Sequence, residues 1–188
     1  MGDPAGASDG LIAVRYRAIE SLADAPRLHA VHLGRLAHDR VDPSSASESL
    51  PSLESLRLAL GATLHGDWNG DWLVAEGAGT VVAYGRVEDW QEADDTWVYL
   101  ALGWVLPAWR GRGIGTELLH RTEKRIRARA ALEHPGAIFE FAANASETER
   151  DAAALLLHEG YTCAYTVVEM ALAAADSVTL TAMPAGVR

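Results

Sequence analysis

The amino-acid sequence predicts an α/β (α+β) fold, in which a sheet of six to seven strands is flanked by helices. Apolar side chains recur at alternate positions in some segments and at every third or fourth position in others, and the two patterns follow one another along the chain. With 188 residues, 49% of them apolar and 22% charged, the chain is long enough to bury the core of one domain.

The first half of the chain predicts one strand, two helices and a hairpin of two further strands. Residues 12–19 alternate apolar and charged side chains and are expected to form a strand, after a disordered start at residues 1–10. Residues 21–41 are expected to be helical with a break at Pro26, and a second helix is expected over residues 53–64. Residues 71–76 and 81–87 are expected to form a hairpin, followed by a charged loop at residues 88–95.

The second half continues the alternation. An apolar strand is expected at residues 97–106, then a glycine-rich turn and a helix to about residue 131, in which one stripe packs on the sheet: Ile114, Leu118, Thr122 and Ile126. A strand at residues 137–143 and a helix at residues 147–159 follow, and Gly160 ends that helix. Residues 161–172 are expected to close the sheet as one long strand or two short ones. The domain then spans residues 11–173, with a tail or the start of a linker at 174–188.

Composition argues against several classes of function. The net charge of −10 is unsuited to nucleic acid, and the longest apolar run, residues 97–106, is about half the length of a membrane-spanning helix. Cys163 stands alone, which predicts a reducing cytoplasm, and the histidines of the first predicted helix lack acidic or cysteine partners, so no metal site is expected. Abundant Ala and Arg beside a single lysine, Lys124, are typical of a GC-rich bacterial genome.

The glycine-rich turn is the most informative segment of the chain. Glycines leave the backbone N–H groups of residues 111–116 uncovered at a helix N-terminus, where free donors and the helix dipole favour an anion such as a pyrophosphate. Arg110 and Arg112 are expected to add positive charge there. The spacing differs from a dinucleotide fingerprint, whose third glycine would stand at Thr116, and from a Walker loop, which requires Gly-Lys. A flexible loop is the remaining alternative, and it has no need of arginines at fixed offsets.

The order Arg110-x-x-Gly113-x-Gly115 directly after a strand resembles the signature of the GCN5-related N-acetyltransferases (GNAT), most of all one half of a tandem-domain member. The resemblance runs along residues 12–172 and implies a mixed, mostly antiparallel sheet, acetyl-CoA as co-substrate, and direct attack by a primary amine in a ternary complex. Val105 is expected to offer its N–H to the thioester carbonyl. The expected coenzyme-binding residues are Trp104, Val105, Leu106, Arg110, Gly111, Arg112, Gly113, Ile114, Gly115, Thr116 and Asn144.

The catalytic residues are harder to assign, because the family's frequent general acid is a Tyr and this chain has Leu156 at that position. Tyr161 is a candidate acid, and core packing is its alternative role. Glu140 is a candidate base because it lies four residues before Asn144 on one strand face; a salt-bridged or exposed carboxylate is the alternative.

Two functions remain open at this stage: an enzyme acting on an amine of a small molecule or peptide, and a degenerate module that only binds acetyl-CoA or supports a partner. The open partners are a second copy of the chain in a homodimer or a second domain of the same family.

Overall fold

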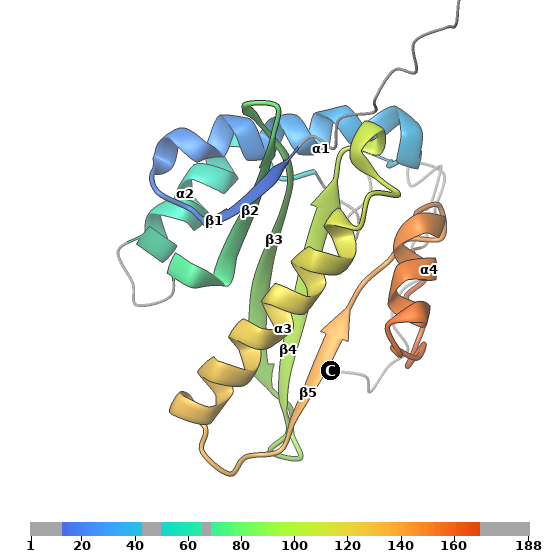
Figure 1. Cartoon of the computed structure of the whole chain (residues 1–188). Helices are drawn as coiled ribbons and strands as arrows, with labels where there is room; N and C mark the ends of the chain where they lie inside the picture. The colour runs from blue at the N-terminus through green and yellow to red at the C-terminus, as the bar shows by residue number, and fades with distance from the viewer. Residues whose placement is uncertain (1–12, 43–49, 65–68, 170–188) are drawn as a thin grey trace, which may run out of the picture.

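The computed structural model describes residues 13–42, 50–64 and 69–169 as a mixed sheet with helices on both faces (Figure 1). The strands are β1 (Val14–Ala18), β2 (Trp72–Gly77), β3 (Thr80–Gln91), β4 (Trp97–Val105) and β5 (Phe139–Ala143), and they lie side by side in sequence order. β1 to β4 pair antiparallel, and β5 pairs with β4 in parallel. The predicted fold class is therefore confirmed. The predictions for residues 1–10 and 174–188 lie outside the described residues.

Two helices, α1 (Ala25–Asp39) and α2 (Leu53–Leu64), cover one face of the sheet. Leu28 and Val31 of α1 and Leu60 of α2 are buried against strand residues such as Val74. The predicted break at Pro26 is instead the start of α1, after a short 3-10 helix (Leu22–Asp24), because proline needs no hydrogen-bond acceptor in a first helical turn. α2 spans the predicted leucine repeat from Leu53 to Leu64.

The other face is covered by α3 (Ile114–Glu133), which runs in front of the strands in Figure 1. Its predicted stripe is confirmed, since Ile114, Leu118, Thr122 and Ile126 are all buried. A last helix, α4 (Arg150–His158), lies beyond β5 and reaches the first turn of α3. The contact is close: a Cβ atom on Gly115 would lie 3.2 Å from Leu155 Cδ2.

The hairpin between β2 and β3 has a two-residue turn in which Ala78 and Gly79 both have positive φ, 52° and 78°. β3 then continues to Gln91, so most of the predicted charged loop is a strand and only residues 92–96 connect it to β4. β2 pairs with β3 only as far as Arg86. Beyond that point β3 has β4 as its neighbour, and charged side chains can reach solvent there.

The predicted closing strand at residues 161–172 is not found in the described part of the chain. Residues 161–169 form no strand, and residues 170–172 lie outside the described residues, so the described sheet has five strands rather than six to seven. Tyr165, Val167 and Val168 are exposed. The β-branched residues favour an extended chain, but a strand also needs a pairing edge, which local sequence does not specify.

Candidate functional site

β4 and β5 separate halfway along β4. Their pairing ends at Ala101 and Ala143, whereas β4 continues to Val105 and stays paired with β3. The N–H of Leu106 donates to Val82 O in β3 at 2.9 Å. Because N–H groups alternate between the two edges of a strand, those of Val105 and Gly103 point to the edge that β5 has left. Within the described part of the chain, these donors face the space between the two strands rather than another strand.

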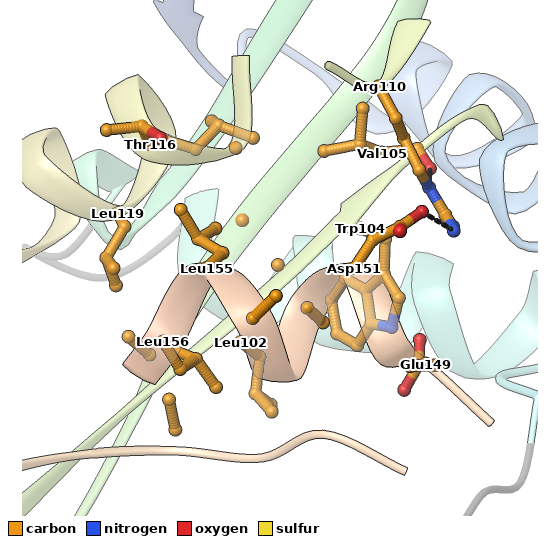
Figure 2. Close-up of a pocket in the computed structure, with 18 of the residues that line it drawn as sticks. Leu102, Trp104, Val105, Arg110, Thr116, Leu119, Glu149, Asp151, Leu155 and Leu156 are labelled. Carbon is orange, nitrogen blue, oxygen red and sulfur yellow. Dashed lines mark hydrogen bonds and ion pairs between the residues drawn. The ribbon is translucent and has the colours of Figure 1, made fainter. Parts of the chain in front are cut away.

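A cavity of about 720 Å³ occupies the space between the separated strands. Its walls come from β4, the glycine-rich turn, the first turns of α3, the end of β5 and α4. Figure 2 shows two different ends: Leu119, Leu155 and Leu156 line one, and the polar side chains of Arg110, Glu149 and Asp151 gather at the other.

The glycine-rich turn joins this cavity to the start of α3, just after the 3-10 helix Pro107–Trp109. Gly111 and Gly113 have φ of 69° and 76°, a conformation that other residues adopt at a cost. Gly113 is the N-cap of α3, and no side chain of the described residues caps the helix. The first N–H groups of α3 are therefore available, and together with the helix dipole they form an anion site at the cavity rim.

The two arginines of the turn have different roles. The Arg112 side chain is exposed and lies 5.1 Å above the Trp109 ring. Arg110 turns toward α1, where its terminal nitrogens donate to Asp39 at 2.6 and 2.7 Å, and its Nε donates to Val105 O at 3.1 Å. Its charge is matched by a buried carboxylate, so Arg112 supplies the free positive charge that the sequence assigned to both.

Asp39 is 1% exposed and is held by three basic side chains. Burial raises its pKa, but the hydrogen bonds from Arg110 and His38 outweigh burial and hold the pKa of Asp39 below its usual value, so it is ionised. Arg35 donates to Asp39 at 3.4 Å and to Glu149 at 2.5 Å. This network ties α1 to both the glycine-rich turn and the start of α4.

Trp104 forms a wall of the cavity and rests on two neutral groups. Its ring lies 4.8 Å from those of both His32 and Tyr84. His32 Nε2 and the Tyr84 hydroxyl are hydrogen-bonded to each other. Burial and the nearby Arg35 charge lower the pKa of His32 to about 3, and burial raises the pKa of Tyr84. Both groups are therefore uncharged at neutral pH and pack as part of the core.

The model of the acetyltransferase (GNAT) family matches residues 35–143, which include the turn and both separated strands. The chain belongs to this family. No curated protein matches it in sequence.

Solved structures share the fold at low identity. A GCN5-related N-acetyltransferase from Sphaerobacter thermophilus is 23% identical with a TM-score of 0.62, and the match covers 79% of this chain. This chain spans only 43% of that protein. A predicted acetyltransferase from Clostridium acetobutylicum with acetyl-CoA is 17% identical, covering 85% of this chain and 96% of the other, with a TM-score of 0.59. A putative acetyltransferase from Salmonella typhimurium with its cofactor acetyl-CoA is 20% identical, with 80% of each chain covered and a TM-score of 0.58.

Most of the expected coenzyme-binding residues of this GNAT domain line the cavity: Trp104, Val105, Arg110, Gly111, Gly113, Gly115, Thr116 and Asn144. Leu106 and Ile114 do not, because their side chains pack into the core. Arg112 lies on the surface beside the turn. Ile114 can therefore contribute its backbone N–H to the anion site, and Arg112 can contribute its charge.

The geometry supports neither sequence-derived catalytic candidate. Glu140 is exposed, pairs across the sheet with Val98 and does not line the cavity. Asn144 lies just after the end of β5, and the four residues from Glu140 to Asn144 span about 13 Å if extended. Tyr161 packs beside α3, where its hydroxyl donates to Glu123 Oε1 at 2.9 Å, and burial and this hydrogen bond raise its pKa. Leu156, at the family's acid position, lines the cavity.

Sequence reasoning missed other residues of the cavity wall, among them Arg35, Thr122, Glu149, Asp151 and Leu155. Thr122 was predicted only as part of the packing stripe. The Arg35 and Glu149 pair is separated by 114 positions along the chain, and no local pattern signals such a contact.

Within the described ranges, no three His, Cys, Asp or Glu side chains are grouped so as to hold a metal ion. No helix there combines the length and the apolar character needed to cross a bilayer.

Proposed function

We propose that this chain is an acetyl-CoA-dependent N-acetyltransferase. The observation that carries the proposal is the unpaired edge of β4 beside an uncapped helix N-terminus. The N–H groups of the turn and of α3 bind the pyrophosphate, with Arg112 adding charge, and the cavity takes the pantetheine arm between β4 and α4. The thioester carbonyl then lies beside the N–H groups of Val105 and Gly103.

The proposed reaction is direct acyl transfer. The amine nitrogen attacks the acetyl carbonyl carbon, the C–N bond forms, the C–S bond breaks, and coenzyme A leaves as the thiolate. The strand N–H groups stabilise the oxyanion, and removing one such donor typically lowers kcat by about 100- to 1000-fold. The proton lost by the amine passes to Asp151 or Glu149, the carboxylates of the cavity wall, directly or through water.

The acceptor and the setting belong to the same proposal. The two carboxylates at one end of the cavity suit an amine carried by a small molecule or a peptide. We propose a bacterial cytoplasmic protein whose domain spans residues 11–173, and whose partner is a second copy or a second GNAT domain rather than nucleic acid or membrane.

The second candidate function is a non-catalytic acetyl-CoA-binding module, and Leu156 in the cavity wall favours it. A leucine cannot protonate the departing sulfur. A thiol has a pKa of about 8.5, however, so coenzyme A departs tolerably as a thiolate without an acid. This chemistry favours the enzyme over the module.

Acetyl-CoA is expected to raise the melting temperature under both functions, because it binds the folded state. Only an enzyme releases free thiol faster when amines are added. A broad panel of small amines and peptides, followed by a thiol reagent, separates the two. If no amine accelerates thiol release, the module is the better description.

Arg112→Glu is expected to abolish most of the thermal shift, since it places a negative charge beside the pyrophosphate. The loss of affinity should be at least about tenfold. Arg57→Glu is the matched control, because Arg57 is exposed on α2 across the sheet and the change in net charge is the same. Equal shifts in the two variants would contradict the proposed phosphate site.

A further inference from the structure

The cavity reaches beyond the open edge of β4 and passes beneath α3. Gly85 of β3 lines it together with Gly103 of β4 and Thr122 of α3. Gly85 and Gly103 are direct partners in the register of the two strands. The cavity therefore reaches the face of these strands that α3 covers, beside the β4 edge along which a pantetheine arm would lie.

The glycine at position 103 is not demanded by the protein itself. A Cβ atom there would find Tyr84 O at 4.0 Å as its nearest neighbour, and Gly103 is not among the residues with positive φ. Gly85 differs, because a Cβ atom there would lie 3.1 Å from Leu102 O and 3.7 Å from Thr122 Oγ1, so Thr122 already covers this glycine. A glycine in a strand interior with free space above it marks a close approach by a ligand.

The walls around this extension are largely apolar. Leu119 and Leu156 pack with Ala101, which is two residues from Gly103 and on the same face of β4. Thr122 is 7% exposed and lines the cavity, and its hydroxyl makes no hydrogen bond within the described residues. We call the space lined by Gly85, Gly103, Leu119, Thr122 and Leu156 the acyl chamber.

We propose that the acyl chamber accepts an acyl group longer than acetyl, so that short-chain acyl-CoA such as butyryl-CoA is the preferred donor. The inference rests on the proposed function, because the N–H groups of Gly103 and Val105 hold the thioester carbonyl at the chamber entrance. The three carbons that butyryl carries beyond its carbonyl lie over Gly103, where the chamber is open, and against Leu119 and Leu156. The transfer step is unchanged: the amine forms a C–N bond to the acyl carbon and the thiolate leaves.

Binding constants of acetyl-, propionyl- and butyryl-CoA, measured by calorimetry on the full chain, test the proposal without needing the acceptor. Each methylene buried in an apolar space favours binding by about fourfold, so butyryl-CoA, with two more methylenes, is expected to bind about 15-fold tighter than acetyl-CoA. If acetyl-CoA binds and butyryl-CoA binds equally or more weakly, the acyl chamber is refuted while the proposed function stands. If none of the three binds, both fail.

Two substitutions at Thr122 test where the acyl group of the donor lies. Thr122→Ile places one extra carbon in the acyl chamber, whereas Thr122→Val keeps the volume and the β-branched shape. Thr122→Ile is expected to lower the butyryl-to-acetyl ratio of affinities by about fourfold or more, and Thr122→Val to preserve it. Gly103→Ala adds a methyl group from the opposite wall, and the same fall in the ratio is expected. Unchanged ratios in both Thr122→Ile and Gly103→Ala would place the acyl group elsewhere and overturn the proposal.

Discussion

Two carboxylates, Asp39 and Asp71, are buried near opposite ends of α3, and each is held by two arginines. Asp39 pairs with Arg110 and Arg35, and Asp71 accepts from Arg125 Nε at 3.1 Å and from Arg129 at 2.8 Å. α3 has 20 residues, which is about 30 Å of helix between the two ends. The two clusters contain the same chemical groups at similar burial.

Their surroundings separate them. Arg110 and Arg35 line the 720 Å³ cavity together with Glu149, whereas the Asp71 cluster contributes no residue to that cavity. Arg129 instead joins Asp71 to Asp89 of β3 and to Glu133 at the end of α3. A buried ion-pair network therefore does not by itself indicate a functional site. The Asp39 cluster is linked to the proposed reaction because Arg110 contacts the end of β4 that β5 leaves within the described residues.

The largest expected effect is common to both clusters. Asp39→Ala and Asp71→Ala should each lower the free energy of unfolding by about 2–3 kcal/mol, because each change removes hydrogen bonds to charged guanidinium groups. Arg35 keeps Glu149 as a partner and Arg129 keeps Asp89, so neither buried charge is left alone. Urea unfolding of the purified variants measures this. A loss below about 1 kcal/mol at either position would show that water reaches and solvates that cluster.

The affinity for acetyl-CoA is expected to distinguish the Asp39 cluster from the Asp71 cluster. Asp39→Asn keeps the side-chain shape but releases Arg110, which holds Val105 O, so acetyl-CoA should bind about tenfold more weakly. Asp71→Asn should leave the dissociation constant within about twofold. Calorimetry below the melting temperature of both variants provides the comparison. Equal weakening would mean that the effect is one of general stability rather than of positioning.

His32 is buried on the same helix as Asp39, but its hydrogen-bond partner is the neutral hydroxyl of Tyr84 rather than a charged group. The folded protein holds its pKa at about 3, below the 6.5 of the unfolded chain. Between these pH values the unfolded state binds a proton that the folded state does not, so stability falls as pH falls from 6.5, by at most about 1.4 kcal/mol per pH unit.

His32→Gln should remove that part of the slope and keep a hydrogen bond to Tyr84. Urea midpoints from pH 7 to 4 compare the two proteins. Parallel pH profiles would argue that His32 titrates normally in the folded state.

The smallest effect is expected at Tyr161, which packs behind the cavity-lining Leu156 and does not itself line the cavity. Tyr161→Phe removes a hydrogen bond to Glu123, with about 1 kcal/mol lost in stability and turnover changed less than twofold. A fall in kcat by a factor of about 100 would instead establish Tyr161 as a general acid. The thiol-release assay used for acceptor screening gives this measurement.

The order and type of most elements followed from local pattern. The stripe at Ile114, Leu118, Thr122 and Ile126 predicted a helix with one buried face, and the glycine positions predicted the turn before it. Such features depend on neighbours within one or two helical turns. The length of β3 was underestimated because its charged end lies beyond the edge of β2, and a strand's neighbours are not encoded in its own residues.

The sequence by itself determined the fold class, the family and the uncovered amides of one turn, because periodicity and backbone freedom act over a few residues. Only the tertiary structure decided that Arg110 faces Asp39 across 71 positions, that Glu140 and Tyr161 do not line the cavity, and that Gly103 leaves open space in the cavity wall. Contacts of that kind arise from how β5 diverges from β4 and how the helices pack on the sheet. They depend on distances between elements, which no local pattern of residues specifies.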